Sequence, residues 1–297
     1  MSDQVRLVER METLAHFVGD SHTIIFNGLV FEDRVSNKQR LTRADHHRYF
    51  LAHEVSGWGD KIEERLWRSL LLHDFLGYVP PEHGSKYLPK LTTTQCGAKI
   101  EEGLAAGFMH KKPLVLMCGE IDTRNILSQF KAGTDVELPF AAPQLEALAP
   151  FAATRLISAD EILAFMRREF APLFTGLRIL KEIGLENLFL HSIPPPALDD
   201  DDAERVLTFR RAARVRYKIA LLVNWLYAQA CADLGIGFLN IWDAVCKQGL
   251  LNQDFYLDGL HLNKKAAIVS VNCLHASLSG SPMTYTHPLL DEALTAP

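Results

Sequence analysis

The sequence predicts an α/β protein, a three-layer α/β/α sandwich with a mostly parallel sheet. Short runs of consecutive apolar residues have the length of parallel strands buried on both faces, at residues 14–18, 114–118, 187–191 and 236–241. Segments with helical apolar spacing alternate with them, at residues 60–76, 98–108, 160–182, 204–233 and 264–277. Strands that alternate with helices form a parallel sheet covered by helices. In such sheets, ligands bind beyond the carboxyl ends of the strands.

Length and composition indicate one globular domain over residues 1–297. The chain has 297 residues, of which 48% are hydrophobic, so it can bury a sizeable core. Its 31 Lys and Arg residues against 36 Asp and Glu residues give a net charge of −5. We expect no nucleic-acid partner, because a protein that binds nucleic acid in general needs an excess of positive charge to neutralise many phosphates.

Two segments do not follow the alternating pattern. Residues 129–159 are short and proline-interrupted, so we predict an insertion or lid rather than a second domain. Residues 34–58 contain His46, His47 and His53, but this spacing matches no helix-borne zinc motif and no cysteine accompanies it. We therefore expect no metal.

Cysteine usage and the N-terminus predict a reduced, cytoplasmic protein. The five cysteines are odd in number and show no C-x-x-C spacing, which is typical of free thiols. The first residues lack the basic and apolar regions of a secretory signal. The most apolar helical run, residues 219–228, is too short to cross a bilayer, so no membrane partner is expected.

Two short motifs near opposite ends of the chain carry candidate catalytic side chains. The sequence Gly-Asp-Ser-His at residues 19–22 follows the first predicted strand and puts a serine at the strand exit. A serine nucleophile needs a base and an orienting carboxylate. The sequence Asp-Gly-Leu-His at residues 258–261 supplies both just before the last predicted helix. These residue types also suit turns and helix caps, which remain the structural alternative.

The two motifs together resemble the SGNH, or GDSL-type, serine hydrolase family. The resemblance implies a flavodoxin-like SGNH hydrolase fold, with Ser21 as the nucleophile and His261 as the general base. It implies that Asp258 orients the imidazole of His261. It also implies that the backbone N–H groups of Ser21 and Gly97 bind the oxyanion.

The sequence departs from this family at one landmark. The family's Gly-x-Asn-Asp motif corresponds to Gly-Glu-Ile-Asp at residues 119–122, where Ile121 replaces an oxyanion-binding asparagine and has no donor. Arg124 is the nearest cationic donor in sequence, and we consider it the replacement. An internal ion pair of Arg124 with Glu120 or Asp122 is the alternative, because half-buried charges are costly without partners.

Candidate substrate contacts lie at the same predicted edge of the sheet. They are Asp20, His22, Glu120, Asp122 and His191. A structural role is the favoured alternative for His22, because the side chains of adjacent residues, here Ser21 and His22, rarely point toward one another. A structural role is also favoured for His191, which precedes three consecutive prolines that stiffen the loop.

Four consecutive aspartates, residues 199–202, precede a helix rich in arginine. Carboxylates at a helix start complement the helix dipole, and Asp201 and Arg205 have the i,i+4 spacing of an ion pair. We interpret the segment as a solvated, charged helix. An anion-binding surface is the alternative.

The predicted function is hydrolysis of small acyl esters through an acyl-enzyme on Ser21. Small-molecule or glycan O-acetyl esters are the expected substrates, which follows from the breadth of the family, and no cofactor is needed. An O-acyltransferase with the same triad is one alternative. A non-catalytic ligand-binding protein that retains the fold is another, and Ile121 favours it.

Overall fold

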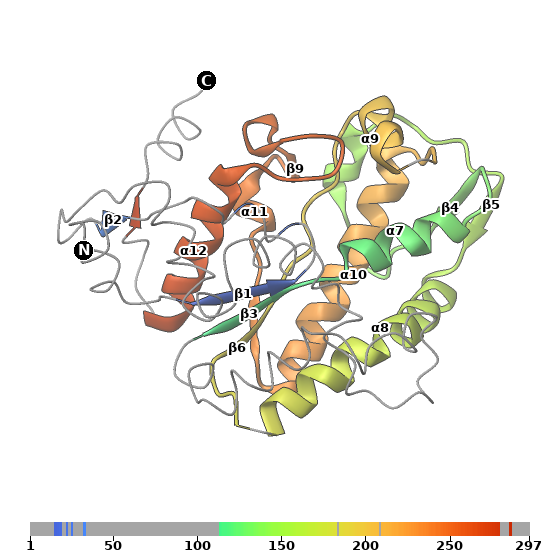
Figure 1. Ribbon diagram of the computed structural model, residues 1–297. Coiled ribbons are helices and arrows are strands. Elements are labelled where there is room, and N and C mark those ends of the chain that lie inside the picture. Colours follow the sequence, from blue (N-terminus) through green and yellow to red (C-terminus); the bar gives the residue numbers. More distant parts are fainter. Residues whose placement is uncertain are drawn as a thin grey trace.

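The centre of the molecule is a four-stranded parallel sheet with strand order β1-β3-β6-β7 (Figure 1). A computed structural model describes residues 15–19, 22, 25, 32–33, 113–182, 184–207, 209–279 and 285–286. The strands are β1 His16–Gly19, β3 Leu114–Met117, β6 Leu188–His191 and β7 Gly237–Leu239. They coincide with the four predicted apolar runs to within two residues at each end, so these strand predictions are confirmed.

The register of the sheet brings the ends of all four strands to one edge. Gly19 at the end of β1 pairs with Met117 at the end of β3, and His191 at the end of β6 pairs with Leu239 at the end of β7. Because every pair is parallel, the residues that follow these strands emerge on the same side. This edge is where the sequence predicts the functional site.

The helices are α7 Glu120–Gln129, α8 Ala159–Glu182, α9 Asp200–Leu207, α10 Ala213–Leu234, α11 Trp242–Val245 and α12 Lys264–Ser279. The predictions for 160–182 and 264–277 are confirmed by α8 and α12. The single helix predicted over 204–233 is wrong, since the chain forms α9 and α10 with a break between them. Helix α7 was not predicted. The predicted helices over 60–76 and 98–108 lie outside the described residues.

Helix α10 contacts several of the other helices and strands. It packs against α8, α7, β6 and β7, while α12 also contacts β7. The α/β class with a mostly parallel sheet is thus confirmed, and the three-layer arrangement of the whole chain stays a prediction.

Small two-stranded sheets complete the described structure. Strands β4 Thr134–Val136 and β5 Arg155–Ile157 pair in parallel, and the 3₁₀ helix η5 Pro143–Ala147 lies between them in sequence. Strands β8 Cys246–Lys247 and β9 Leu250–Leu251 form an antiparallel pair, as do β2 Glu32–Asp33 and β10 Tyr285–Thr286. The 3₁₀ helix η6 Gln253–Phe255 precedes the loop that carries Asp258.

The buried apolar side chains of the described residues form one continuous cluster. Phe17, Val115 and Leu190 from three neighbouring strands are completely buried in it. Burial of such side chains stabilises the fold by about 1.5–3 kcal/mol each. Val136 and Ile157 from the 129–159 segment belong to the same cluster, so this segment shares the core. Its role as a lid stays a prediction.

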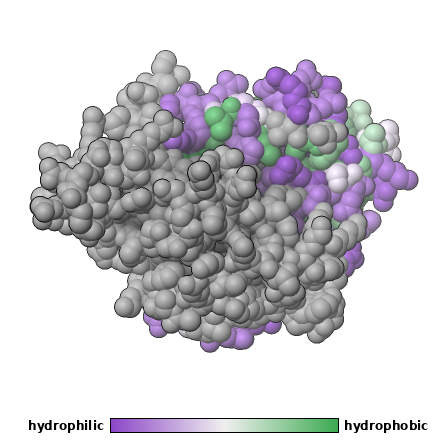
Figure 2. All heavy atoms as spheres, viewed as in Figure 1, coloured by the Kyte–Doolittle hydropathy of each residue, from purple (hydrophilic) through white to green (hydrophobic). Residues whose placement is uncertain are grey.

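The surface of the described residues is mainly hydrophilic on the face drawn in Figure 2, with small apolar patches between the polar residues. Among the described helices, none has both the length and the apolar character required to cross a membrane. Four of the five cysteines are described, and none of these four forms a disulfide: Cys118, Cys231, Cys246 and Cys273.

Candidate active site

A small cavity lies at the carboxyl edge of the sheet. His22, which follows β1, and Glu120, which follows β3, line it together with His191 at the end of β6 and Ile241 beyond β7. The edge predicted from the sequence therefore does collect polar side chains from successive strands. Ser21, Asp20 and Gly97 lie outside the described residues.

Asp258 and His261 form a hydrogen-bonded pair in the loop before α12. His261 Nδ1 lies 2.9 Å from Oδ2 and 3.1 Å from Oδ1 of Asp258. A carboxylate only accepts hydrogen bonds, so Nδ1 carries the proton in this contact and Nε2 of the neutral ring is left as the acceptor. The side chains of His261 and Asp258 are 21% and 42% exposed, respectively.

Backbone donors hold the Asp258 carboxylate in place. Oδ1 accepts hydrogen bonds from Leu260 N at 2.8 Å and from His261 N at 2.7 Å. Partial burial alone would raise the pKa of Asp258, but the hydrogen bonds from the His261 backbone, the His261 ring and the Leu260 backbone outweigh burial and lower it. The carboxylate is therefore kept ionised, as an orienting partner for an imidazole requires.

The loop around this pair is closed by a short hairpin. Leu257 N donates to His261 O at 2.9 Å, and Asn263 N donates to Phe255 O at 2.8 Å. The Asn263 side chain donates to Asp254 O at 2.7 Å and accepts from Lys265 N at 2.9 Å, so it caps α12 and holds the hairpin at once. Asn263 is not among the site residues predicted from the sequence, although an Asn directly before a predicted helix is a capping signal.

The close approach of α9 explains why residue 259 in the loop is a glycine. A Cβ atom at this position would overlap the backbone carbonyl of Asp202 in α9. Only glycine allows the backbones of α9 and the Asp258–His261 loop to approach this closely.

His22 lies beside the Asp258–His261 pair. It is 3% exposed, and its ring centroid is 5.0 Å from that of His261. His22 Nε2 is also 3.7 Å from Glu120 Oε2. The side chain is thus buried and part of the cavity wall, and its contact with a substrate stays a prediction.

Arg124 forms the ion pair that the sequence left as an alternative. Its Nε is 2.9 Å from Glu120 Oε2, with i,i+4 spacing on α7. Arg124 and Glu120 also line a second cavity, whose walls include the loop residues Gly259 and Leu260. Nε of Arg124 is engaged by Glu120, and a guanidinium has four further N–H donors.

Gly119 is the N-cap residue before α7, and its backbone has the left-handed conformation that favours glycine. Its φ is 102°, and a Cβ atom there would overlap the hydroxyl of Tyr227. Tyr227 donates from that hydroxyl to Cys118 O at 3.1 Å, and the Thr123 hydroxyl donates to Gly119 O at 2.7 Å. Ile121 and Asp122 follow in the first turn of α7. The family-like motif is therefore a helix start directly after β3.

His191 is a buried, structurally engaged histidine. Its Nδ1 is 2.6 Å from Ser192 O and its Nε2 is 2.9 Å from Ser270 Oγ on α12. A carbonyl only accepts, so Nδ1 donates, and Nε2 of the neutral ring shares the single Ser270 hydroxyl proton with Ala266 O, which lies 3.0 Å from Oγ. Burial lowers the pKa of His191 to about 4, so the ring is neutral near pH 7.

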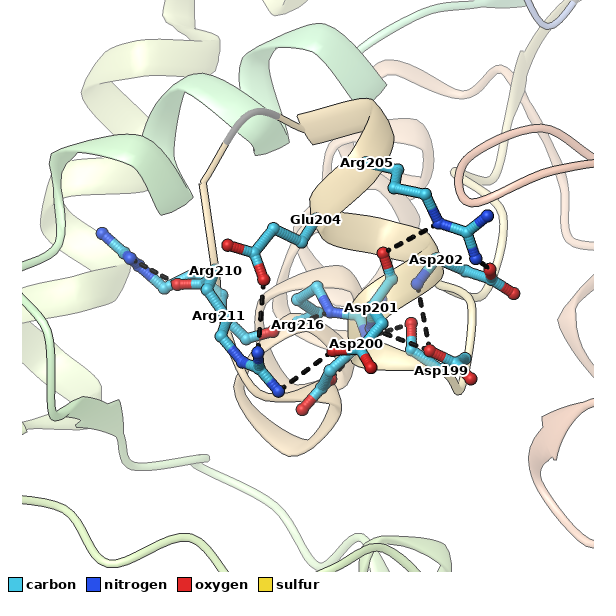
Figure 3. Close-up of polar contacts among 9 residues, drawn as sticks. All are labelled: Asp199, Asp200, Asp201, Asp202, Glu204, Arg205, Arg210, Arg211 and Arg216. Atoms are coloured by element: carbon cyan, nitrogen blue, oxygen red, sulfur yellow. Dashed lines mark hydrogen bonds and ion pairs between the residues drawn. The ribbon is translucent and has the colours of Figure 1, made fainter.

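The acidic run and the arginines form a connected charge cluster around α9 (Figure 3). Asp199 Oδ1 accepts from the backbone N–H groups of Asp201 and Asp202, so Asp199 caps α9. The predicted pairing of Asp201 with Arg205 is wrong: Arg205 pairs with Asp202, and Asp201 pairs with Arg210 at 3.2 Å. A helix start at Asp200 turns Asp202 toward Arg205 at i,i+3.

Among the described residues, no three His, Cys, Asp or Glu side chains lie close enough together to hold a metal ion. His46, His47 and His53 lie outside the described residues.

Comparisons with known proteins do not assign a family. No family model matches the sequence. No curated protein matches it either. One solved structure, described as "The structure of a putative platelet activating factor from Streptococcus pneumonia", is similar with a TM-score of 0.38 and 13% sequence identity, over 93% of this chain and 90% of that chain. A likeness at this level carries no argument about fold or function.

Proposed function

We propose that the protein is a serine esterase of the SGNH type that cleaves small acyl esters. The observation that carries this proposal is the contact between Asp258 and His261, with Nδ1 of His261 2.9 Å from the carboxylate. A carboxylate held by backbone donors and bonded to Nδ1 fixes an imidazole in the tautomer that accepts a proton at Nε2.

Ser21 is the nucleophile in this proposal. It directly precedes His22 in the sequence, and the His22 ring centroid is 5.0 Å from that of His261. His261 Nε2 takes the proton from the Ser21 hydroxyl as its oxygen attacks the ester carbonyl carbon. The alcohol then leaves with that proton, and a water activated by His261 hydrolyses the acyl-enzyme.

The oxyanion of the tetrahedral intermediate needs donors. Backbone N–H groups of Ser21 and Gly97 are the proposed donors, with the remaining guanidinium N–H groups of Arg124 in place of the missing asparagine. Asp20, His22, Glu120, Asp122 and His191 remain proposed contacts around the substrate. The burial and hydrogen bonds of His191 favour a supporting role over direct contact.

Asp258→Asn tests the observation directly. The asparagine keeps the shape of the side chain, but its amide can donate toward Nδ1 and favours the wrong tautomer of His261. We expect kcat for p-nitrophenyl acetate to fall about 10⁴-fold. Asp254→Asn, a change of the same kind four residues earlier, serves as the control and should keep kcat within a few-fold. Equal activity of the two variants would remove Asp258 from the mechanism.

A further inference from the structure

A third and larger cavity lies at the start of α10, separate from the candidate active site. It has a volume of about 640 Å³ and is lined by the start of β4, the segment after η5, the α9–α10 connection with the first residues of α10, and Leu250. It shares no lining residue with the two cavities beside the Asp258–His261 loop. We call it the arginine cleft, because Arg210, Arg211 and Arg214 line it.

The acidic groups at this cleft are already neutralised. Asp200 lines the cleft and pairs with Arg216 at 2.8 Å. Arg210 pairs with Asp201 at 3.2 Å and with Glu204 at 3.3 Å. Figure 3 shows these carboxylates turned toward Arg210 and Arg216, whereas the Arg211 guanidinium points away from them.

Arg211 and Arg214 keep their positive charge without a carboxylate. Arg211 donates to the carbonyls of Leu127 at 3.0 Å and Phe130, which end α7. Arg214 donates from Nη1 to Leu145 O at 2.7 Å. Among the described residues, no carboxylate forms an ion pair with either guanidinium. Carbonyls carry no net charge, so two half-buried cations face the cleft.

Apart from Thr134, Asp200 and the arginines, the wall of the cleft is apolar. Leu148, Pro150, Phe151, Leu198 and Leu250 contribute hydrocarbon surface around the guanidiniums. Ligand sites of this kind pair an apolar cavity with a few fixed polar groups, and a guanidinium binds planar oxyanions through two parallel hydrogen bonds. Arg214 has four N–H groups beyond its bond to Leu145.

We propose that the arginine cleft binds a small organic anion, an acid group on an apolar body, with Arg214 and Arg211 holding the acid group. The side chains of Leu198 and Phe151 cover the apolar part. This is a binding site additional to the proposed esterase site, and it does not depend on that function.

The test uses the full chain and 1-anilinonaphthalene-8-sulfonate, a sulfonate on an aromatic body, followed by its fluorescence. The decisive variant is Ala149→Glu, because Ala149 is exposed and lines the cleft, so a carboxylate enters it while every arginine contact stays intact. Ala153→Glu is the matched control, since Ala153 is exposed and lies outside the cleft lining. We expect Ala149→Glu to weaken binding about ten-fold or more and Ala153→Glu to leave it unchanged.

A second pair of variants removes a cation instead. Arg214→Met should also weaken binding about ten- to a hundred-fold, because a charge-assisted hydrogen bond is lost, whereas Arg178→Met on the exposed face of α8 should not. N-phenyl-1-naphthylamine, which lacks the sulfonate, should bind more weakly than the anionic probe. Displacement of the probe by octanoate or by octyl phosphate identifies the preferred acid group. Equal binding by Ala149→Glu and Ala153→Glu, or displacement by neither anion, would overturn the proposal.

Discussion

Glu120 and Arg124 place opposite charges beside the candidate active site. The Glu120 side chain is 10% exposed and that of Arg124 is 26% exposed, with 2.9 Å between Oε2 and Nε. Such a pair costs free energy to break, because the remaining carboxylate stays buried without its partner. Arg124 therefore stabilises the fold in addition to any work at the oxyanion.

Arg124→Met separates these two contributions. Loss of an oxyanion donor lowers kcat about 10²–10³-fold with little change in KM, and loss of the ion pair lowers the free energy of unfolding by up to roughly 3 kcal/mol. We expect both effects, measured as kcat for p-nitrophenyl acetate and as the urea midpoint. Arg167→Met, on the exposed part of α8, should show neither. Lower stability with full kcat would limit Arg124 to the ion pair.

Residue-scale contacts differ in how far the sequence reveals them. The i,i+3 spacing of Asp258 and His261 lets one short loop join them, so their contact could be anticipated. The partner of His191 is Ser270, 79 residues away in sequence, and only the packing of α12 against β7 brings them together. No local pattern predicts such a contact.

Elements were predicted well where burial decides the pattern. Parallel strands buried on both faces appear as continuous apolar runs, and β1, β3, β6 and β7 were found this way. Helix α7 is largely polar and follows Gly119, so its residues read as a loop motif. Arg216 of α10 bonds the break between α9 and α10 and the segment before α9: its side chain donates to Arg211 O at 2.9 Å and to Ala197 O at 2.7 Å. This is a tertiary contact that apolar spacing does not encode.

The start of α7 gives a prediction at the scale of the element. Gly119→Ala should destabilise the protein, because a left-handed conformation costs a non-glycine residue roughly 1–2 kcal/mol and the new Cβ overlaps the Tyr227 hydroxyl. In a Tyr227→Phe background the overlap is relieved, so the same substitution should cost less. Urea unfolding of the two single variants and the double variant measures this coupling. Strictly additive losses would mean that the hydroxyl does not limit Gly119.

At the scale of the whole molecule, burial of His191 links stability to pH. Burial lowers its pKa from 6.5 to about 4. Between these values the unfolded chain binds a proton that the folded protein does not, so the free energy of unfolding falls as the pH falls from 6.5 to 4. One pKa unit corresponds to about 1.4 kcal/mol, so this histidine alone accounts for about 3 kcal/mol over the window.

His191→Gln removes the side chain that binds this proton in the unfolded chain. The variant should be less stable than the parent at pH 7, because the bond to Ser270 is altered, but its stability should fall less between pH 6.5 and 4.5. Urea unfolding at several pH values gives both slopes. Identical slopes for the parent and the variant would show that His191 does not titrate on unfolding in this range.

The proposed esterase function requires that Ser21 is an activated serine. The most direct measurement is the intact mass of the protein after incubation with a fluorophosphonate, which labels activated serines without any choice of ester substrate. We predict one adduct on the parent protein, none on Ser21→Ala, and one on Ser128→Ala, whose serine lies exposed on α7. An unlabelled parent protein, or a Ser21→Ala variant labelled as fully as the parent, would contradict the proposed esterase.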